Sequence, residues 1–98
     1  MAETKIEDFQ DWDGDVLFDV CMDTFRRLDG RLIARERAAK EAGDAEAEEA
    51  WRAESMALWG ERRTISAFDR DSPAAAILRW RAREDEVEAG AGPRIVAG

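Results

Sequence analysis

The sequence predicts an all-α protein: a long antiparallel helical hairpin with a shorter third helix, in a three-helix-bundle-like arrangement. Three observations lead to this class. Apolar residues recur at spacings of three and four along most of the chain, which is the period of one helix face. No segment shows the strict apolar–polar alternation that is typical of a strand. Gly43–Asp44 and Ser72–Pro73 carry signals that end one helix and begin another.

The length of 98 residues fits one domain. We expect a helical body over residues 13–89, between a flexible acidic arm at residues 1–12 and a disordered tail at residues 90–98. Within the arm, Phe9 and Trp12 are expected to dock on the body. The three helices are expected at about residues 13–42, 45–68 and 72–89.

The first helix should carry a stripe of apolar side chains that is wide enough to contact two neighbouring elements. Gly30 lies inside this helix, where a glycine costs about 1 kcal/mol relative to alanine, so it is a candidate position for a bend. The stripe consists of Phe18, Cys21, Met22, Phe25, Leu28, Leu32 and Ala39, with Leu17 and Ile33 on its two sides.

The stretch "DWDGDVLFD" at the start of this helix raises the question of a calcium loop. If Asp11 is the first ligand, Val16 stands where such a loop needs glycine, and Met22 stands where it needs a bidentate glutamate. We therefore interpret the stretch as the acidic start of a helix, with Asp13 or Asp15 as the N-cap, because carboxylates stabilise the first turn.

The segment between the first two helices combines a stop signal and a start signal. Gly43 suits the left-handed position after a helix C-terminus, and Asp44 suits the N-cap of the next helix. The second helix should bury one stripe, while Met56 and Trp59 lie on another side, which implies a second packing partner. The buried stripe consists of Ala47, Ala50, Trp51, Ala57, Leu58, Ile65 and Phe68.

The third helix is expected to begin with Ser72 as N-cap and Pro73 as its first helical residue. Ile77, Trp80 and Val87 should face inward. Its charge order is the reverse of the other helices, since basic residues precede acidic ones. We expect either packing against the acidic start of the first helix or a partner surface to explain this reversal. The charges are Arg79, Arg81 and Arg83, followed by Glu84, Asp85, Glu86 and Glu88.

The charges of the first two helices favour an antiparallel hairpin. Both helices begin with acids and end with bases, as the helix dipole prefers, so an antiparallel pair places acid beside base at each end. Each exposed pair contributes only about 0–1 kcal/mol, so the pairs set orientation more than stability. The acids are Asp15, Asp19 and Asp23 in the first helix and Glu46, Glu48, Glu49 and Glu54 in the second; the bases are Arg27, Arg31, Arg35, Arg62 and Arg63.

The same charges leave a second arrangement open. Two copies of the first helix, packed antiparallel across a two-fold axis, would also match the acidic half, Asp15–Asp23, against the basic half, Arg27–Arg35. We favour pairing within the hairpin over pairing between two copies, because surface ion pairs inside one chain are common.

The residue inventory argues against catalysis, cofactors and metals. His and Tyr are absent, and the single cysteine, Cys21, lies on the apolar stripe without an obvious base. No Cys/His metal spacing and no phosphate-binding glycine loop is present. The net charge of −8 disfavours binding to nucleic acid. A local basic segment does occur, and neutralisation by acids opposite it is expected; it consists of Arg26, Arg27, Arg31, Arg35, Arg37 and Lys40.

We expect a cytoplasmic location and no membrane contact, because no leader opens the chain and no apolar run approaches membrane-spanning length. Among the 15 basic residues only Lys5 and Lys40 are lysines. In this usage the chain resembles the small Ala/Arg/Glu-rich helical proteins of actinobacteria, their phages and their mobile elements. The resemblance covers composition alone and implies no site residue.

The strongest interaction signal is a set of Trp, Arg and Met residues, because Trp and Arg are enriched at binding hot spots. Trp59 lies off the hairpin stripe, so it should meet the third helix, a second copy or a partner. Trp80 has the alternative role of closing the bundle with its indole N–H at the edge. The candidate partner-binding residues are Met56, Trp59, Arg63, Arg79, Trp80 and Arg83.

We therefore expect a non-enzymatic protein that self-associates as a homodimer and binds another protein as an adaptor or accessory factor in a GC-rich bacterium, phage or mobile element. The competing class is an acidic decoy or inhibitor, such as an antitoxin, an anti-defence protein or a DNA mimic, that binds a basic protein surface. Salt separates the two classes, because a decoy complex should weaken steeply with ionic strength. The decoy face would carry Asp11, Asp13, Asp15, Asp19 and Asp23.

Overall fold

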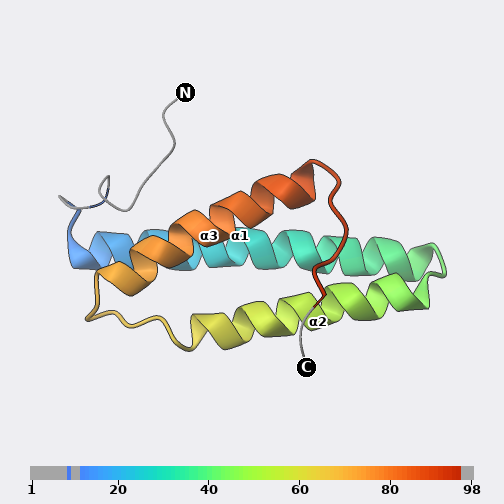
Figure 1. The fold of residues 1–98 in the computed structure, drawn as a ribbon, viewed down its shortest axis with the longest axis horizontal. Coiled ribbons are helices and arrows are strands. Elements are labelled where there is room, and N and C mark those ends of the chain that lie inside the picture. The colour runs from blue at the N-terminus through green and yellow to red at the C-terminus, as the bar shows by residue number, and fades with distance from the viewer. Residues whose placement is uncertain (1–8, 10–11, 96–98) are drawn as a thin grey trace.

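The computed structural model describes Phe9 and residues 12–95, and these residues form three helices and no strand. Helix α1 is Gly14–Glu41, α2 is Ala45–Arg62 and α3 is Asp71–Glu88. α1 and α2 lie antiparallel as a long hairpin, and α3 returns along α1 in the same direction as α1 (Figure 1). The predicted all-α class, a hairpin with a shorter third helix, is confirmed. Within the described part of the chain, no helix combines the length and apolar character needed to cross a bilayer.

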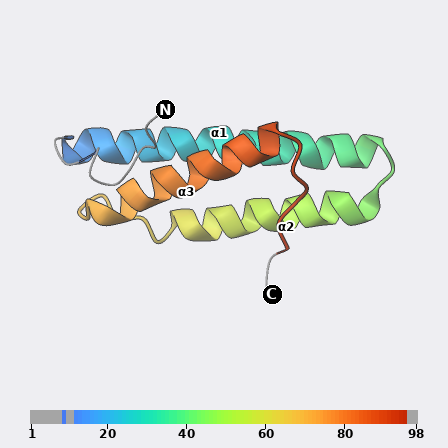
Figure 2. The ribbon, with the colours of Figure 1, turned by 45° about the horizontal axis from the view of Figure 1, so that its top comes forward.

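α1 is the central element of the bundle because its wide apolar stripe faces both other helices. α2 and α3 contact each other much less than each contacts α1, so the two helices diverge over it (Figures 1 and 2). The predicted contact of the α1 stripe with two neighbours is confirmed. The buried core includes Leu17, Cys21, Met22, Phe25, Leu28, Leu32 and Ala39 of α1, Trp51 and Leu58 of α2, and Ile77, Trp80 and Val87 of α3.

The turn between α1 and α2 has the geometry expected from its residues. Gly43 adopts the left-handed conformation with a φ of +73°. The amides of Gly43 and Asp44 donate to the carbonyls of Lys40 and Ala39 at 3.1 and 2.9 Å, which is the pattern of a Schellman motif. The Asp44 carboxylate then caps α2 by accepting the amide of Ala47 at 3.0 Å.

α1 begins as its acidic residues predicted. The Asp13 carboxylate accepts the amide of Asp15 at 2.9 Å, so Asp13 is the N-cap of α1. Asp11, the first position of the calcium-loop alternative, lies outside the described residues. Among the described residues there is no group of three or more His, Cys, Asp and Glu side chains that could hold a metal ion.

α2 ends at Arg62, so the prediction that it continues to Phe68 is wrong. The Thr64 hydroxyl donates to the carbonyl of Glu61 at 2.7 Å, and the Ser66 hydroxyl accepts the amide of Phe68 at 3.1 Å. Such local side-chain bonds compete with the backbone bonds of a helix. Phe68 is consequently fully exposed in the loop between α2 and α3 instead of belonging to the buried stripe.

α3 begins at Asp71, so the prediction of Ser72 as its N-cap is also wrong. The carboxylate of Asp69 accepts the amide of Asp71 at 2.9 Å and holds the chain at this earlier start. Pro73 therefore lies within the first turn, where its missing N–H removes no helix hydrogen bond.

The arginines in the second half of α1 face α3, so their predicted pairing with the acids of α2 is wrong. Arg31 Nε donates to Glu84 Oε2 at 2.9 Å, and Arg27 Nε lies 3.6 Å from the same carboxylate. Arg35 donates to the carbonyl of Val87 at 2.8 Å. Because α3 runs parallel to α1, its acidic second half lies beside the basic half of α1, which explains the reversed charge order of α3.

Both ends of the chain contact the bundle where they are described. The ring of Phe9 is buried and meets the ring of Trp12 edge-on, with centroids 4.8 Å apart. The carbonyls of both residues accept hydrogen bonds from Arg70, at the start of α3. The expected docking of these two residues is confirmed, and residues 1–8, 10 and 11 of the predicted flexible arm lie outside the described part.

Residues 90–95 leave the end of α3 and cross toward α2 (Figures 1 and 2). The amide of Arg94 donates to Glu54 Oε1 of α2 at 2.8 Å, and the carbonyl of Gly92 accepts from Arg83 at 2.8 Å. Residues 90–95, the first part of the predicted tail, are thus held by polar groups of the bundle. Residues 96–98 lie outside the described part.

Candidate functional site

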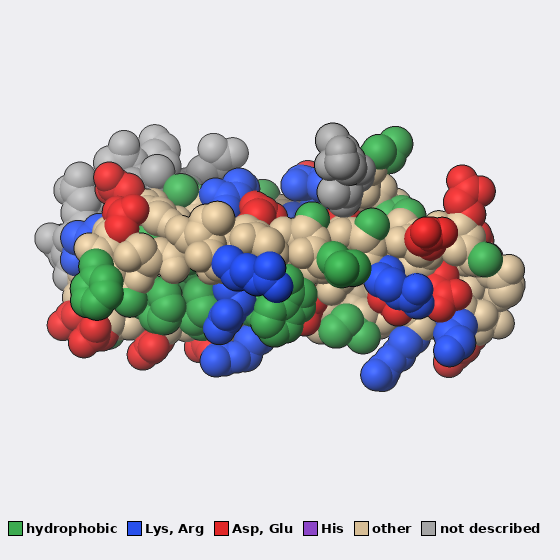
Figure 3. Space-filling model, turned by 90° about the horizontal axis from the view of Figure 1, so that it is seen from below, with side chains coloured by type: hydrophobic (Ala, Val, Ile, Leu, Met, Phe, Trp, Pro, Cys, Tyr) green, Lys and Arg blue, Asp and Glu red, His purple; other side chains and the backbone are tan. Residues whose placement is uncertain are grey.

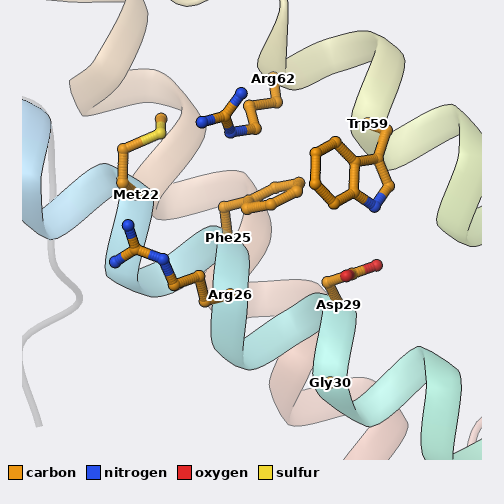
Figure 4. Close-up of a pocket in the computed structure, with 7 residues that line it drawn as sticks. All are labelled: Met22, Phe25, Arg26, Asp29, Gly30, Trp59 and Arg62. Carbon is orange, nitrogen blue, oxygen red and sulfur yellow. The ribbon is translucent and has the colours of Figure 1, made fainter.

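A crevice with a volume of about 230 Å³ lies between α1 and the end of α2. The α1 residues that line it recur at three- and four-residue spacing, so they share one face of that helix. Two residues of the last turn of α2 close the other side (Figure 4). We name it the Trp59 crevice; it is lined by Met22, Phe25, Arg26, Asp29, Gly30, Trp59 and Arg62.

The wall of the Trp59 crevice is aromatic. The Trp59 ring stands edge-on against the buried Phe25 ring, with centroids 4.8 Å apart and an interplanar angle of 87°. Phe25 also meets Trp80 of α3, with centroids 5.9 Å apart, and is thus fixed from both sides. Trp59 itself is 43% exposed, so a large part of its indole remains available at the surface.

Two arginines border this aromatic wall. The guanidinium of Arg62 lies 5.4 Å from the centroid of the Phe25 ring and 5.6 Å from that of Trp59, which is within cation–π range. Arg62 forms no ion pair with any described residue. Arg26 forms an exposed pair with Asp23 at 2.9 Å. The crevice therefore combines an apolar wall with a basic edge. In Figure 3, hydrophobic and basic side chains lie next to each other near the C-terminal end of α2.

A buried polar contact holds α1 and α2 together beside the crevice. The Ser55 hydroxyl donates to Asp29 Oδ1 at 2.8 Å, and both side chains are buried. This hydrogen bond places the two helices at a defined separation, so the distance between Phe25 and Trp59 does not depend on apolar contact alone. The sequence gives no signal for this contact, because no local pattern shows that an Asp and a Ser on different helices face each other.

The structure divides the six predicted partner-binding residues. Trp59 lines the crevice, but it rests on α1, which was not among the three neighbours considered for it. Met56, at 69% exposed, and Arg63 are at the surface without lining the crevice. Trp80 and Arg83 are buried in the bundle, so neither presents a surface to a partner in this arrangement.

Trp80 closes the bundle, which was the alternative role expected for it. It is only 2% exposed and closes the bundle between α1 and α3, but its indole Nε1 is buried and lacks a hydrogen-bond partner among the described residues. Its expected position at a solvated edge is therefore wrong. Its neighbour Arg79 remains exposed, with its guanidinium 5.9 Å from the Trp80 ring and 3.2 Å from the Glu61 carboxylate of α2.

Arg83 is the centre of a buried polar network. Its guanidinium donates to both oxygens of Glu54, at 2.7 and 2.8 Å, and this hydrogen bonding raises the pKa of Arg83 above its usual value. A further bond of 3.0 Å reaches Glu86, whose pKa is lowered by Arg83 and then by Arg94. The network joins α2, α3 and residues 90–95, and its charges are used inside the chain.

A second hollow, with a volume of about 240 Å³, lies where α2 and α3 diverge. Its floor is formed by Leu28 and Leu32 of α1, and Trp80 forms part of its wall. Arg94 and Ile95 line it as well, so the C-terminal segment already occupies its margin. This hollow belongs to the internal packing of the bundle and its network.

Cys21 is fully buried in the core, and desolvation raises the pKa of its thiol to about 11, although the positive charge of Arg79 acts in the opposite direction. A thiol with this pKa stays protonated near neutral pH and is a poor nucleophile. The Trp59 crevice contains a single carboxylate, Asp29, which is engaged by Ser55.

Comparisons of the chain with protein-family models, with curated proteins and with solved structures find no match.

Proposed function

We propose that this protein is a non-enzymatic interaction protein, an adaptor or accessory factor, that binds another protein at the Trp59 crevice. One observation carries this proposal. The exposed Trp59 is fixed on buried Phe25, and unpaired Arg62 lies against both rings. Fixed aromatic side chains lose little conformational entropy on binding, and Trp and Arg contribute much of the affinity at protein interfaces.

The shape and charge of the crevice suggest the chemistry of its ligand. A volume of about 230 Å³ suits one large apolar side chain of a partner. Arg62 and Arg26 at the edge favour a carboxylate next to that side chain. The proposed partner segment therefore presents a Leu or an aromatic residue adjacent to an Asp or Glu.

The residue inventory supports a role without catalysis. The chain has no His and no Tyr, and the thiol of Cys21 is enclosed in the core. Binding, by contrast, requires only the apolar wall and the basic edge that the crevice offers.

Selection from a displayed library of random peptides tests the proposal without knowledge of the natural partner. We expect enrichment of peptides that combine an apolar side chain with a neighbouring carboxylate. Their affinity for the Trp59→Ala variant should fall by at least about tenfold, as expected for loss of a hot-spot residue. Phe68→Ala is the matched control, because Phe68 is also an exposed aromatic residue but lies away from the crevice.

Two results would contradict the proposal. One is enrichment of peptides whose binding is equally strong to wild type and to Trp59→Ala. The other is equal weakening by Trp59→Ala and by Phe68→Ala, which would indicate general hydrophobic adhesion instead of a defined site.

The acidic-decoy alternative is supported by one different observation. At the start of α1, Asp15 and Asp19 form no ion pair among the described residues, and Arg62 of α2, expected near them, pairs with no described acid either. A peptide complex at the Trp59 crevice should weaken only slightly between low and physiological salt. A decoy would instead bind a basic protein surface, and its affinity would decrease steeply over the same range.

A further inference from the structure

One side of α1 is left open by the bundle. α2 covers one flank of α1 and α3 covers another, and the remaining residues on the third flank are exposed. Along this flank the residues are separated alternately by three and four positions, so the pattern repeats every seven residues. This is the spacing of a coiled-coil seam. We name this flank the open face; it consists of Val16, Asp19, Asp23, Arg26, Gly30, Ile33 and Arg37.

The open face carries two exposed apolar side chains, which are 17 residues apart on α1. Val16 is 50% exposed near the start of α1, and Ile33 is 36% exposed in its second half. Neither residue is in the buried core. A covering surface that contacts both must therefore extend along several turns of the helix, as another helix would.

Gly30 lies between Val16 and Ile33, and no packing contact inside the chain requires a glycine at this position. A Cβ atom at this position would meet nothing within 4 Å, and its backbone is not left-handed. Glycine weakens the interior of a helix relative to alanine. Its presence is accounted for if a backbone or side chain from outside approaches α1 closely at this point.

The charges of the open face are complementary to themselves. Asp19 and Asp23 precede Arg26 and Arg37 along the same flank. A second copy of α1 packed antiparallel brings the acidic half of one open face to the basic half of the other. The local pair of Asp23 and Arg26, 2.9 Å apart, becomes a four-charge cluster when two copies meet across a two-fold axis.

We propose that the open face binds a second copy of this chain, forming an antiparallel two-fold α1–α1 interface. In the register we infer, Asp23 lies opposite Arg26 of the other copy, Val16 opposite Ile33, and Asp19 opposite Gly30. A shift by seven residues toward the N-terminus places Asp19 opposite Asp23, which is repulsive. The inferred register therefore matches opposite charges at the centre and apolar side chains at both ends.

This interface differs from the one expected from the sequence. That arrangement used Arg27, Arg31 and Arg35, which in the structure are turned toward α3. The proposal also goes beyond peptide binding at the Trp59 crevice, with which the open face shares only Arg26 and Gly30.

Charge exchange tests the interface by sedimentation over a range of concentrations. We expect wild type to dimerise, and we expect Asp23→Arg and Arg26→Asp each to raise the dissociation constant by at least about tenfold, because like charges then face each other. The combined variant restores opposite charges and should return to within about threefold of wild type. Both positions are exposed, and circular dichroism verifies that the variants stay helical.

Crosslinking tests the register. Positions 16 and 33 are 17 residues apart on α1, about 25 Å along a helix, which is too far for a disulfide within one chain. The variant that combines Val16→Cys with Ile33→Cys should therefore form a covalent dimer on mild oxidation, and each single variant should not. Native Cys21 is present in all of these chains, and because it is fully buried it should not take part in crosslinking.

The results that would overturn the interface are specific. The first is a wild-type chain that stays monomeric at every concentration. The second is a combined charge variant whose dimer dissociates as readily as those of the single variants. The third is crosslinking by Val16→Cys alone. Trp59→Ala should leave the dimer constant within about twofold. A monomeric wild type that still binds peptides through Trp59 would refute this interface and leave the proposed function standing.

Discussion

Arg83 of α3 and Glu54 of α2 form a buried ion pair with two hydrogen bonds, of 2.7 and 2.8 Å, and neither side chain is more than 9% exposed. The pair joins two helices that otherwise contact each other little. Glu54 also accepts the amide of Arg94, and Arg83 donates to the carbonyl of Gly92, so the same pair holds residues 90–95. A single charged contact thus ties three segments together.

Loss of Arg83 should be strongly destabilising. The Arg83→Met variant leaves the carboxylate of Glu54 buried without its partner, and the free energy of unfolding should fall by about 3–5 kcal/mol. Urea denaturation at neutral pH measures this change. Arg79→Ala is the matched control, because its pair with Glu61 is exposed and should contribute at most about 1 kcal/mol. Equal effects of the two variants would refute the structural role of the buried pair.

The hydrogen bond between Ser55 and Asp29 should contribute measurably to the packing of α1 against α2. Ser55→Ala leaves a buried carboxylate with one acceptor unsatisfied, so the free energy of unfolding should decrease by about 1–3 kcal/mol. Ser66→Ala, in the exposed loop, is the control and should change it by less than about 1 kcal/mol. A double-mutant cycle with Asp29→Ala would show no coupling energy if the two side chains were independent.

Two glycines should respond to alanine in opposite ways. Gly43 has a φ of +73°, so Gly43→Ala should lower the free energy of unfolding by about 1–2 kcal/mol. Gly60 is inside α2 and its Cβ would meet nothing, so Gly60→Ala should raise it by about 0.5–1 kcal/mol. Thermal unfolding of the two variants under identical conditions compares these effects. Changes of the same sign would contradict the turn geometry.

The burial of Cys21 predicts slow thiol chemistry. At pH 8 the native protein should react with a thiol-specific disulfide reagent only as fast as it opens, whereas the chain in denaturing urea should react at once. Fast reaction of the native protein would show that the thiol is accessible.

The same burial predicts a loss of stability at high pH. Desolvation raises the pKa of Cys21 from 9.0 to about 11, so the folded state holds its proton more tightly than the unfolded state does. The contribution of the protonated, buried thiol to the free energy of unfolding is fully present below pH 9. It is lost as the pH rises toward 11, because the unfolded chain then gives up this proton first. Over this range, the unfolding free energy of wild type should fall more steeply than that of Cys21→Ala. Parallel pH profiles would contradict the shift.

The candidate site was only partly predictable. Trp59 stood out because it lies off the stripe of α2, and the structure places it in the crevice. Phe25 and Arg62 complete the site. From the sequence, Phe25 was expected only in the core, and Arg62 only as part of the charge pattern of the hairpin. Their juxtaposition depends on the separation and rotation of α1 and α2, which no local pattern encodes. Trp80 and Arg83 carried the same composition signal as Trp59, but they are buried because α3 turns them inward.

The sequence by itself determined the local features of this protein. Helical periodicity, the left-handed Gly43 and the caps Asp13 and Asp44 act through neighbours a few residues away, so they can be inferred without the fold. The tertiary structure decided which charged groups meet. α3 runs parallel to α1 and takes the arginines expected to face α2, and Glu54 holds Arg83 and residues 90–95. These outcomes depend on long-range geometry, because a charge can pair with any opposite charge that packing brings within a few ångströms.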